Sequence, residues 1–249
     1  MSNEVTVSVS GAVRTVTLSR PAKRNALTSE MLAVLEAAFS AEPATDERVA
    51  VVRAEGLAFC SGVDLSERPP ARNLIERAFH AVEHFPMPVV AIVQGDAIAG
   101  GAELALHCDI VVAVETVRIG MSLAQIGLAP PWPLALKLLD VAGPSVARAI
   151  LLLGDPVSAA HLAALGVIAR AVPLDDLETT AQQLIDRLTT NAPLSLRAIK
   201  ASLLRAAAVR DQIPHEDIDR LIDAAGRSED AREGMRARLE KRPAAFRGR

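Results

Sequence analysis

Two turns that contain glycine carry the residues best suited to chemistry. The first, residues 58–65, reads AFCSGVDL and follows an apolar segment. The second, residues 95–104, reads GDAIAGGAEL and holds Gly100, Gly101 and Glu103. Glycine lets the chain turn sharply and lets a ligand approach the backbone, so each turn can present an unpaired N–H group. Two such groups aimed at one oxygen would stabilise an enolate or a tetrahedral oxyanion, with one donor contributing about 3 kcal/mol in the transition state.

Other interpretations of these turns and of the nearby acids stay open. Taken singly, each turn also fits an ordinary strand-to-helix connection, and neither matches the G-x-G-x-x-G pattern of a dinucleotide site. Glu103 falls in the first turn of an expected helix, where the helix dipole alone favours an acid. Asp64 is expected to hold its own turn, and Asp109, at the start of a strand, to accept structural hydrogen bonds.

The hydrophobic pattern predicts the strands and helices that position these turns. Alternating apolar residues at 5–9 and 14–18 predict a β-hairpin, and Thr28 is expected to cap a helix. Three short apolar runs predict buried strands, at residues 49–53, 88–93 and 109–114. The helices expected between these strands indicate parallel pairing in βαβ units.

The pattern changes after Pro133, where helical segments rich in alanine and leucine replace strand signals. Helices are predicted over residues 175–190 and 194–208. We place a soft boundary near residue 190, between a core of residues 1–190 and a C-terminal helical region of residues 191–249. The second part is too short for a full hydrophobic core of its own.

Composition excludes several classes of function. The chain has 249 residues, a net charge of −3 and few aromatic residues, so neither a polyanion-binding patch nor base stacking on aromatics is expected. No apolar run approaches the length of a membrane span, and the N-terminus lacks the pattern of a secretory signal. The two cysteines, Cys60 and Cys108, form neither a disulfide framework nor a metal-ligand cluster. A protein of the reducing cytoplasm, with no bound metal, is therefore expected.

The two turns belong to a longer series of motifs that runs along the chain. The motifs are Arg20-Pro21-x3-Asn25-Ala26-Leu27, Phe59-Cys60-Ser61-Gly62-Val63-Asp64-Leu65, Pro88-Val89-Val90-Ala91-Ile92-Val93-Gln94-Gly95, Gly100-Gly101-x-Glu103-Leu104-Ala105, Cys108-Asp109, Ser158-Ala159-x2-Leu162-Ala163-x2-Gly166 and Arg242-Pro243-x2-Phe246. This set resembles the enoyl-CoA hydratase/isomerase (crotonase) superfamily, and the resemblance spans nearly the whole chain.

The resemblance implies an α/β fold with a crotonase-like spiral of ββα units and two nearly perpendicular sheets. A C-terminal helical trimerisation region would follow, giving a homotrimer or a dimer of trimers. The implied substrate is an acyl-CoA thioester, so no separate cofactor is expected.

The resemblance also assigns residues to the site. The oxyanion-hole N–H groups fall on Val63 and Gly100. The residues implied to bind CoA are Lys23, Arg24 and Ala26 at the adenine and phosphate end, the backbone of Val63, Asp64 and Leu65 along the pantetheine, and Phe246, from the same or a neighbouring subunit, near the adenine.

One catalytic position departs from the family pattern. Similar hydratases use two glutamates to position a water and to exchange protons with it and with the α-carbon. Glu103 matches the first glutamate. The second lies in a segment that reads F-G-x-P-E in active hydratases, and aligning this segment on Gly120 and Gly127 places Leu123 there. Leucine cannot transfer a proton, so Glu103 is left as the single base.

Three more residues are linked to the acyl pocket by the resemblance. Trp132, in the sequence Pro-Pro-Trp-Pro where the family has P-G-x-G, is expected to narrow or cap the pocket. His80 lies on a helix that flanks the pocket in relatives, but amphipathic packing or a partly exposed histidine is favoured over a catalytic role. Asp140 is a candidate replacement acid, although a charge on a helix surface also accounts for it.

Three functions are compatible with these residues. The first is a hydratase-like lyase that acts on an enoyl-CoA through the oxyanion hole and Glu103. The second is a non-catalytic or weakly catalytic acyl-CoA binder or carrier, because Leu123 replaces a glutamate. The third is another reaction of the superfamily, such as isomerisation, decarboxylation or hydrolysis.

Overall fold

The computed structural model describes residues 4–65, 72–208 and 213–249. Within these ranges the strands form two sheets. The first sheet contains β1 (Val5–Ser10), β2 (Val13–Leu18), β3 (Val49–Ala54), β5 (Val89–Val93), β7 (Ile110–Val114) and β10 (Arg170–Val172), in that order. The second contains β4 (Ala58–Cys60), β6 (Asp96–Ile98), β8 (Arg118–Gly120) and β9 (Val157–Ser158).

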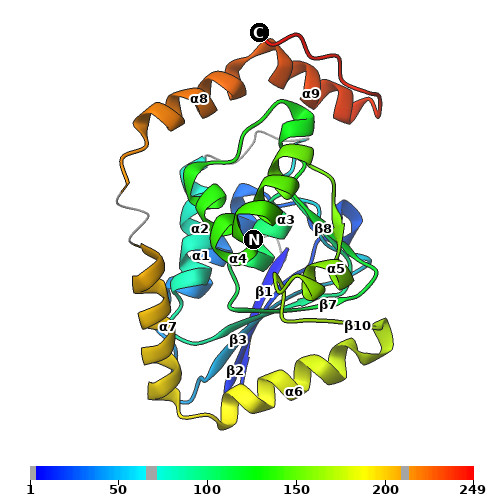
Figure 1. Ribbon diagram of the computed structural model, residues 1–249. Coiled ribbons are helices and arrows are strands. Elements are labelled where there is room, and N and C mark those ends of the chain that lie inside the picture. The colour runs from blue at the N-terminus through cyan, green and yellow to red at the C-terminus, as the bar shows by residue number, and fades with distance from the viewer. Residues whose placement is uncertain (1–3, 66–71, 209–212) are drawn as a thin grey trace.

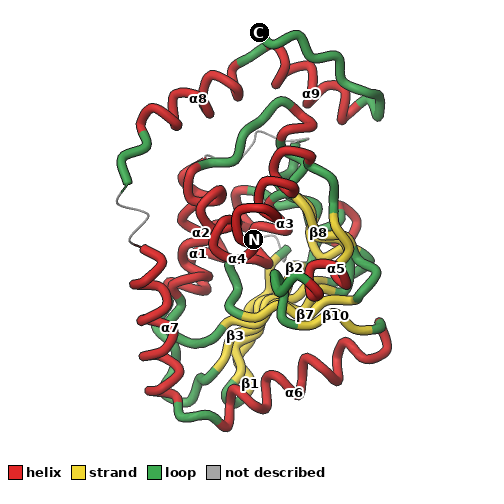
Figure 2. Tube along the Cα trace, in the orientation of Figure 1, coloured by secondary structure: helices red, strands yellow, loops and turns green. Residues whose placement is uncertain are grey.

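Helices surround the strands, as Figures 1 and 2 show. The α-helices are α1 (Ser29–Ser40), α2 (Arg72–His84), α3 (Gly100–Leu106), α4 (Trp132–Leu153), α5 (Ala159–Ala164), α6 (Leu177–Thr190), α7 (Pro193–Ala207), α8 (Glu216–Arg227) and α9 (Glu229–Leu239). Short 3-10 helices are η1 (Pro21–Lys23), η2 (Ala124–Ile126) and η3 (Leu174–Asp176).

Successive ββα units build the two sheets together. β3, β5 and β7 each belong to the first sheet, and the strand that follows each of them belongs to the second sheet and leads toward α2, α3 or α4. The expected α/β fold with a spiral of ββα units is therefore confirmed. The parallel pairing expected of the three apolar runs is confirmed for β3, β5 and β7, but the βαβ interpretation missed the short strands that follow them, β4, β6 and β8. These strands have only three residues each, too few for an alternating pattern to be visible.

The first sheet forms the centre of the core. β1 and β2 pair as the predicted antiparallel hairpin, and β2, β3, β5, β7 and β10 pair in parallel. Every residue of β5 is buried, as expected for a parallel strand covered on both faces. Thr28 caps α1 by accepting a hydrogen bond from the Met31 N–H, which confirms the predicted helix start.

The long helix α4 begins inside the Pro-Pro-Trp-Pro sequence, at Trp132. A kink follows at Gly143, whose φ of 69° is left-handed, and Pro144 opens the second half, where its missing N–H is tolerated. The first half forms one wall of the cavity described below.

The C-terminal helices lie at the periphery of the molecule (Figure 1). α7 is joined to the core through buried Lys200, whose Nζ lies 2.6 Å from an Asp109 carboxylate oxygen. The same oxygen accepts a 2.7 Å hydrogen bond from the Val89 N–H, so Asp109 has the structural role expected from the sequence. None of the described helices is long and apolar enough to cross a membrane.

Candidate functional site

The two glycine turns meet at the carboxyl ends of β4 and β6. A Cβ added to Gly100 would lie 3.6 Å from the Val63 nitrogen, and a Cβ added to Gly62 would lie 3.4 Å from the Gly100 nitrogen. The close approach requires glycine, because a Cβ on Gly101 would lie 2.2 Å from the Cys60 carbonyl oxygen. The structure thus brings together two backbone amides that are 37 residues apart in the sequence, Val63 and Gly100.

Both amides remain available for a ligand. Among the residues that the structure describes, the N–H groups of Val63 and Gly100 donate no hydrogen bond. Ala99, just before α3, has a φ of 50° and a ψ of −119°, a strained conformation for a residue with a Cβ. A 2.8 Å hydrogen bond from the Ala99 N–H to the Gly120 carbonyl holds Ala99 in this conformation. This arrangement directs the start of α3, and so the Gly100 amide, toward the other turn.

The segment of residues 20–27 supports the first turn through buried polar contacts. Asn25 is fully buried; its Nδ2 donates to the carbonyls of Glu55 and Ala58, both at 2.8 Å, and its Oδ1 accepts from the Arg20 N–H. Arg20 also forms a 2.6 Å ion pair with buried Asp64. Asp64 therefore holds its turn, as expected. The Arg-Pro and Asn-Ala-Leu signature fixes the backbone beside Val63.

Glu103 lies one helical turn beyond Gly100. Its side chain is 9% exposed, and its carboxyl group makes no hydrogen bond with the described part of the chain. Burial, with a smaller contribution from the charge of Glu76, raises the pKa of Glu103 to about 8. Desolvation therefore outweighs the stabilisation that a helix N-terminus gives to a carboxylate, and the carboxyl group is mostly protonated at neutral pH.

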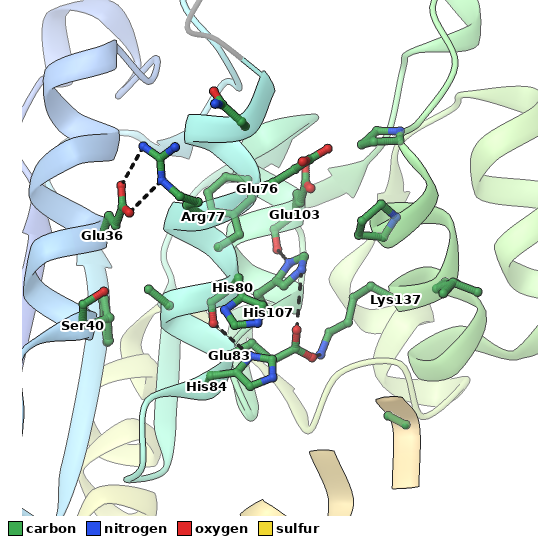
Figure 3. A pocket seen from close by; sticks show the side chains of 18 of the residues that line it. Glu36, Ser40, Glu76, Arg77, His80, Glu83, His84, Glu103, His107 and Lys137 are labelled. Atoms are coloured by element: carbon green, nitrogen blue, oxygen red, sulfur yellow. Dashed lines mark hydrogen bonds and ion pairs between the residues drawn. The ribbon is translucent and has the colours of Figure 1, made fainter. Parts of the chain in front are cut away.

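Glu103 opens into a cavity of about 740 Å³. Figure 3 shows the polar side chains that line it, and α2 supplies many of them. Asn73, Glu76, His80 and Glu83 recur on one face of α2, while the opposite face packs into the core. His80 is thus placed at the cavity, where its ring stacks on that of His84 at 3.7 Å between centroids. Asn73 lies in the first turn of α2.

A network of hydrogen-bonded and charged side chains lines the cavity, and the sequence alone did not reveal it. His107 is buried, and its Nδ1–H donates to the Glu103 carbonyl at 2.8 Å. Burial lowers the pKa of His107 to about 4, so the ring is neutral at physiological pH. Lys137 on α4 pairs at 2.7 Å with Glu83, whose other oxygen lies 3.9 Å from His107. The i, i+4 spacing of Glu103 and His107 was the only available signal, because Glu83 and Lys137 come from other helices.

Leu123 and Trp132 lie near the site but do not line this cavity. Leu123 is half-buried and immediately precedes η2, three residues after the Gly120 carbonyl that holds Ala99. Pro131 and Pro133 line the cavity, whereas the Trp132 ring stacks on His215 at 5.1 Å. Trp132 therefore contacts the segment that begins α8.

The residues expected at CoA fall into two groups. Lys23 and Arg24 are exposed beside the first turn, because the Arg24 carbonyl accepts a 3.0 Å bond from the Ser61 N–H. Ala26 and Leu65 are half-buried in the same region. Phe246 is 45% exposed and lines a separate cavity next to η2, between the C-terminal tail and the start of α9. Within one chain, the structure does not bring Phe246 into the group around Lys23.

Buried cysteines and metal ligands add no further chemistry. Burial raises the pKa of Cys60 to about 12, so this thiol packs as a neutral group within the first glycine turn. In residues 4–65, 72–208 and 213–249, no group of three or more His, Cys, Asp or Glu side chains is arranged to hold a metal. The described site thus combines two adjacent backbone amides with the acidic side chains of the cavity.

Comparison with known proteins defines the family. The sequence model of the enoyl-CoA hydratase/isomerase family matches residues 8–249. The chain belongs to the enoyl-CoA hydratase/isomerase family. It is 32% identical to the 2,3-dehydroadipyl-CoA hydratase of Escherichia coli, over 99% of this chain and 100% of that protein. It is 35% identical to the 1,2-epoxyphenylacetyl-CoA isomerase of the same organism, over 96% of this chain and 97% of the relative.

Solved structures of the family share the fold. The carnitinyl-CoA hydratase of Mycobacterium avium superposes with a TM-score of 0.86 at 28% identity, and all of each chain is covered. These relatives include hydratases and an isomerase, so family membership alone leaves the reaction of this chain open.

Proposed function

We propose that this protein is an enoyl-CoA hydratase-type enzyme that adds water across the C2=C3 bond of an enoyl-CoA thioester. The observation that carries the proposal is Glu103, a buried acid with a pKa near 8 that lies one turn beyond a free oxyanion amide and opens into a cavity. Such a tuned acid next to two amides is suited to thioester enolate chemistry.

Each group has a defined part in the proposed reaction. Attack of water at C3 moves electrons onto the thioester oxygen, where the N–H groups of Val63 and Gly100 stabilise the enolate. The proton that the attacking water loses passes to solvent. Protonated Glu103 then donates its proton to C2, giving the 3-hydroxyacyl-CoA. In the reverse direction, ionised Glu103 is the base that removes the C2 proton.

CoA is proposed to extend from the oxyanion hole across the first turn. Exposed Lys23 and Arg24 would pair with its phosphates, Ala26 would contact the adenine end, and the backbone of residues 63–65 would line the pantetheine. Phe246 lies away from this group within one chain, so in a trimer or a dimer of trimers it would serve a neighbouring subunit. The thioester is itself the substrate, and the proposed reaction uses no separate cofactor.

Turnover of a chain-length series of 2-enoyl-CoA thioesters, followed by the loss of the enoyl chromophore, tests this proposal. The wild type should form 3-hydroxyacyl-CoA, and Glu103→Gln should lose about 100-fold or more of that rate. Equal rates for the two proteins would exclude catalysis by Glu103.

Leu123 favours a second candidate, an acyl-CoA binder or carrier with little or no catalysis. This candidate predicts tight acyl-CoA binding without product, and it predicts that Leu123→Glu creates hydratase activity. Thermal-shift screening of acyl-CoA thioesters, followed by mass spectrometry of the incubated sample, separates the two. Rapid hydration by the wild type would eliminate the binder.

A further inference from the structure

We propose that Glu76 on α2 is the second catalytic carboxylate of this protein, acting on the water from the wall of the cavity that faces Glu103. This inference rests on the proposed hydratase function and deepens it. The chain has Leu123 where a second acid is expected, so a hydratase built on this scaffold needs a proton acceptor from another element. Glu76 was not recognisable from the sequence, because it matches no motif.

The geometry places Glu76 in the same cavity as Glu103. α2 packs against α3, and Glu76 and Glu103 line the same cavity from these two helices. Figure 3 shows both side chains reaching into the same part of that cavity. The charge of Glu76 raises the pKa of Glu103, so the two carboxyl groups interact electrostatically across the space that a substrate would enter.

Other acids of the cavity are less well placed. Glu36 and Glu83 also line the cavity, but the charge of neither is among the causes of the Glu103 pKa shift. Asp140 also lines the cavity, from α4, yet its charge is not among the causes of the Glu103 pKa shift. Among the described acids of the cavity, Glu76 is the one whose charge acts on Glu103.

Different environments give the two acids different tasks. Glu103 is buried and mostly protonated, whereas Glu76 is half-buried and therefore better hydrated. Two nearby carboxyl groups tend to hold one proton between them, because both cannot ionise at low cost. Glu103 is therefore assigned the part of proton donor, and the better hydrated Glu76 the part of proton acceptor.

The reaction balances with these assignments. The Glu76 carboxylate takes a proton from water as the water oxygen bonds to C3 and the C2=C3 π electrons move toward the thioester oxygen. The enolate then takes the Glu103 proton at C2. The products are 3-hydroxyacyl-CoA, protonated Glu76 and ionised Glu103. Proton exchange with solvent restores the starting pair, so the sum is one enoyl-CoA plus one water.

Two reactions of the same site test the proposal. One is hydration of a 2-enoyl-CoA, which needs both acids. The other is exchange of the C2 hydrogen of a saturated acyl-CoA with deuterium oxide, which needs the oxyanion hole and Glu103 but no attacking water. Glu76→Gln should lower kcat for hydration about 100-fold or more and leave exchange within about threefold of the wild type, whereas Glu103→Gln should lose both.

Controls separate catalysis from folding. Glu178→Gln removes an exposed acid paired with Arg53 far along the chain and should change neither rate. Asp140→Asn tests the competing acid, and a hydration loss there but not in Glu76→Gln would overturn the proposal. Thermal unfolding and acyl-CoA binding should match the wild type in Glu76→Gln. If that variant fails to fold, Glu76→Asp gives the same comparison, and its hydration must fall more than its exchange.

The remaining outcomes are also decisive. Equal losses of hydration and exchange in Glu76→Gln would show a structural role and overturn the proposal. Wild-type hydration that is insensitive to Glu76→Gln overturns the role of Glu76 and leaves the hydratase function standing. A wild type that performs neither reaction overturns both.

Discussion

Replacing Glu103 with Gln tests whether its carboxyl group is held in a desolvated site. Glutamine has nearly the same shape and cannot ionise. The pKa of Glu103 lies near 8 in the folded protein, against 4.5 for an ordinary glutamate. Because the folded pKa is the higher one, the unfolded chain releases this proton first as the pH rises. Folding stability is therefore full below about pH 4.5 and falls until the pH passes about 8.

The size of the effect follows from the two pKa values. Each pKa unit corresponds to about 1.4 kcal/mol. Between pH 5 and pH 8, the wild type should lose about 3 to 4 kcal/mol of folding free energy relative to Glu103→Gln. That difference corresponds to roughly 6 to 16 °C in Tm for a chain of this size.

Thermal unfolding at several pH values, followed by the fluorescence of Trp132, the single tryptophan, measures this difference. The pH-independent effect of the substitution cancels when the two pH values are compared. Glu36→Gln is a matched control, because Glu36 lines the same cavity but is paired with Arg77. Between pH 5 and pH 8, the change in its folding free energy should differ from that of the wild type by less than about 1 kcal/mol. Parallel pH curves for the wild type and Glu103→Gln would refute the desolvated site.

Three further changes test the site and its support. The hydration rate should fall as the pH rises through about 8, because Glu103 then loses the proton it donates. A pH profile of kcat measures this, and a rate that rises over that interval contradicts the prediction. Gly100→Ala should fold, since its new Cβ meets only ordinary contacts of 3.5 Å or more, but its methyl should crowd the oxyanion hole and lower kcat about 100-fold. Gly101→Ala is the contrasting variant, because its Cβ would lie 2.2 Å from a carbonyl oxygen; circular dichroism should show misfolding there, and normal folding would contradict the close packing. Lys200→Met should cost about 3 kcal/mol in urea unfolding because it leaves Asp109 without its 2.6 Å ionic partner, and unchanged stability would show that this pair does not anchor α7.

Local sequence patterns determined much of this protein. The hairpin, the Thr28 cap and the strands β3, β5 and β7 follow from periodicity and capping, which depend on residues close together in the chain. Glu103 was recognisable for the same reason, since its spacing from Gly100 on one short helix places it beside the turn. The order of the motifs along the chain was sufficient to indicate the family.

Only the tertiary structure decided what surrounds Glu103. The strands of the second sheet are too short to leave a periodic signal, yet they hold the Val63 and Gly100 amides side by side. Glu76, Glu83 and Lys137 carry no motif, and they reach the cavity because α2 and α4 pack on either side of α3. The pKa of Glu103 depends on this enclosure, because desolvation is set by every group that excludes water from the carboxyl and not by its neighbours in the sequence.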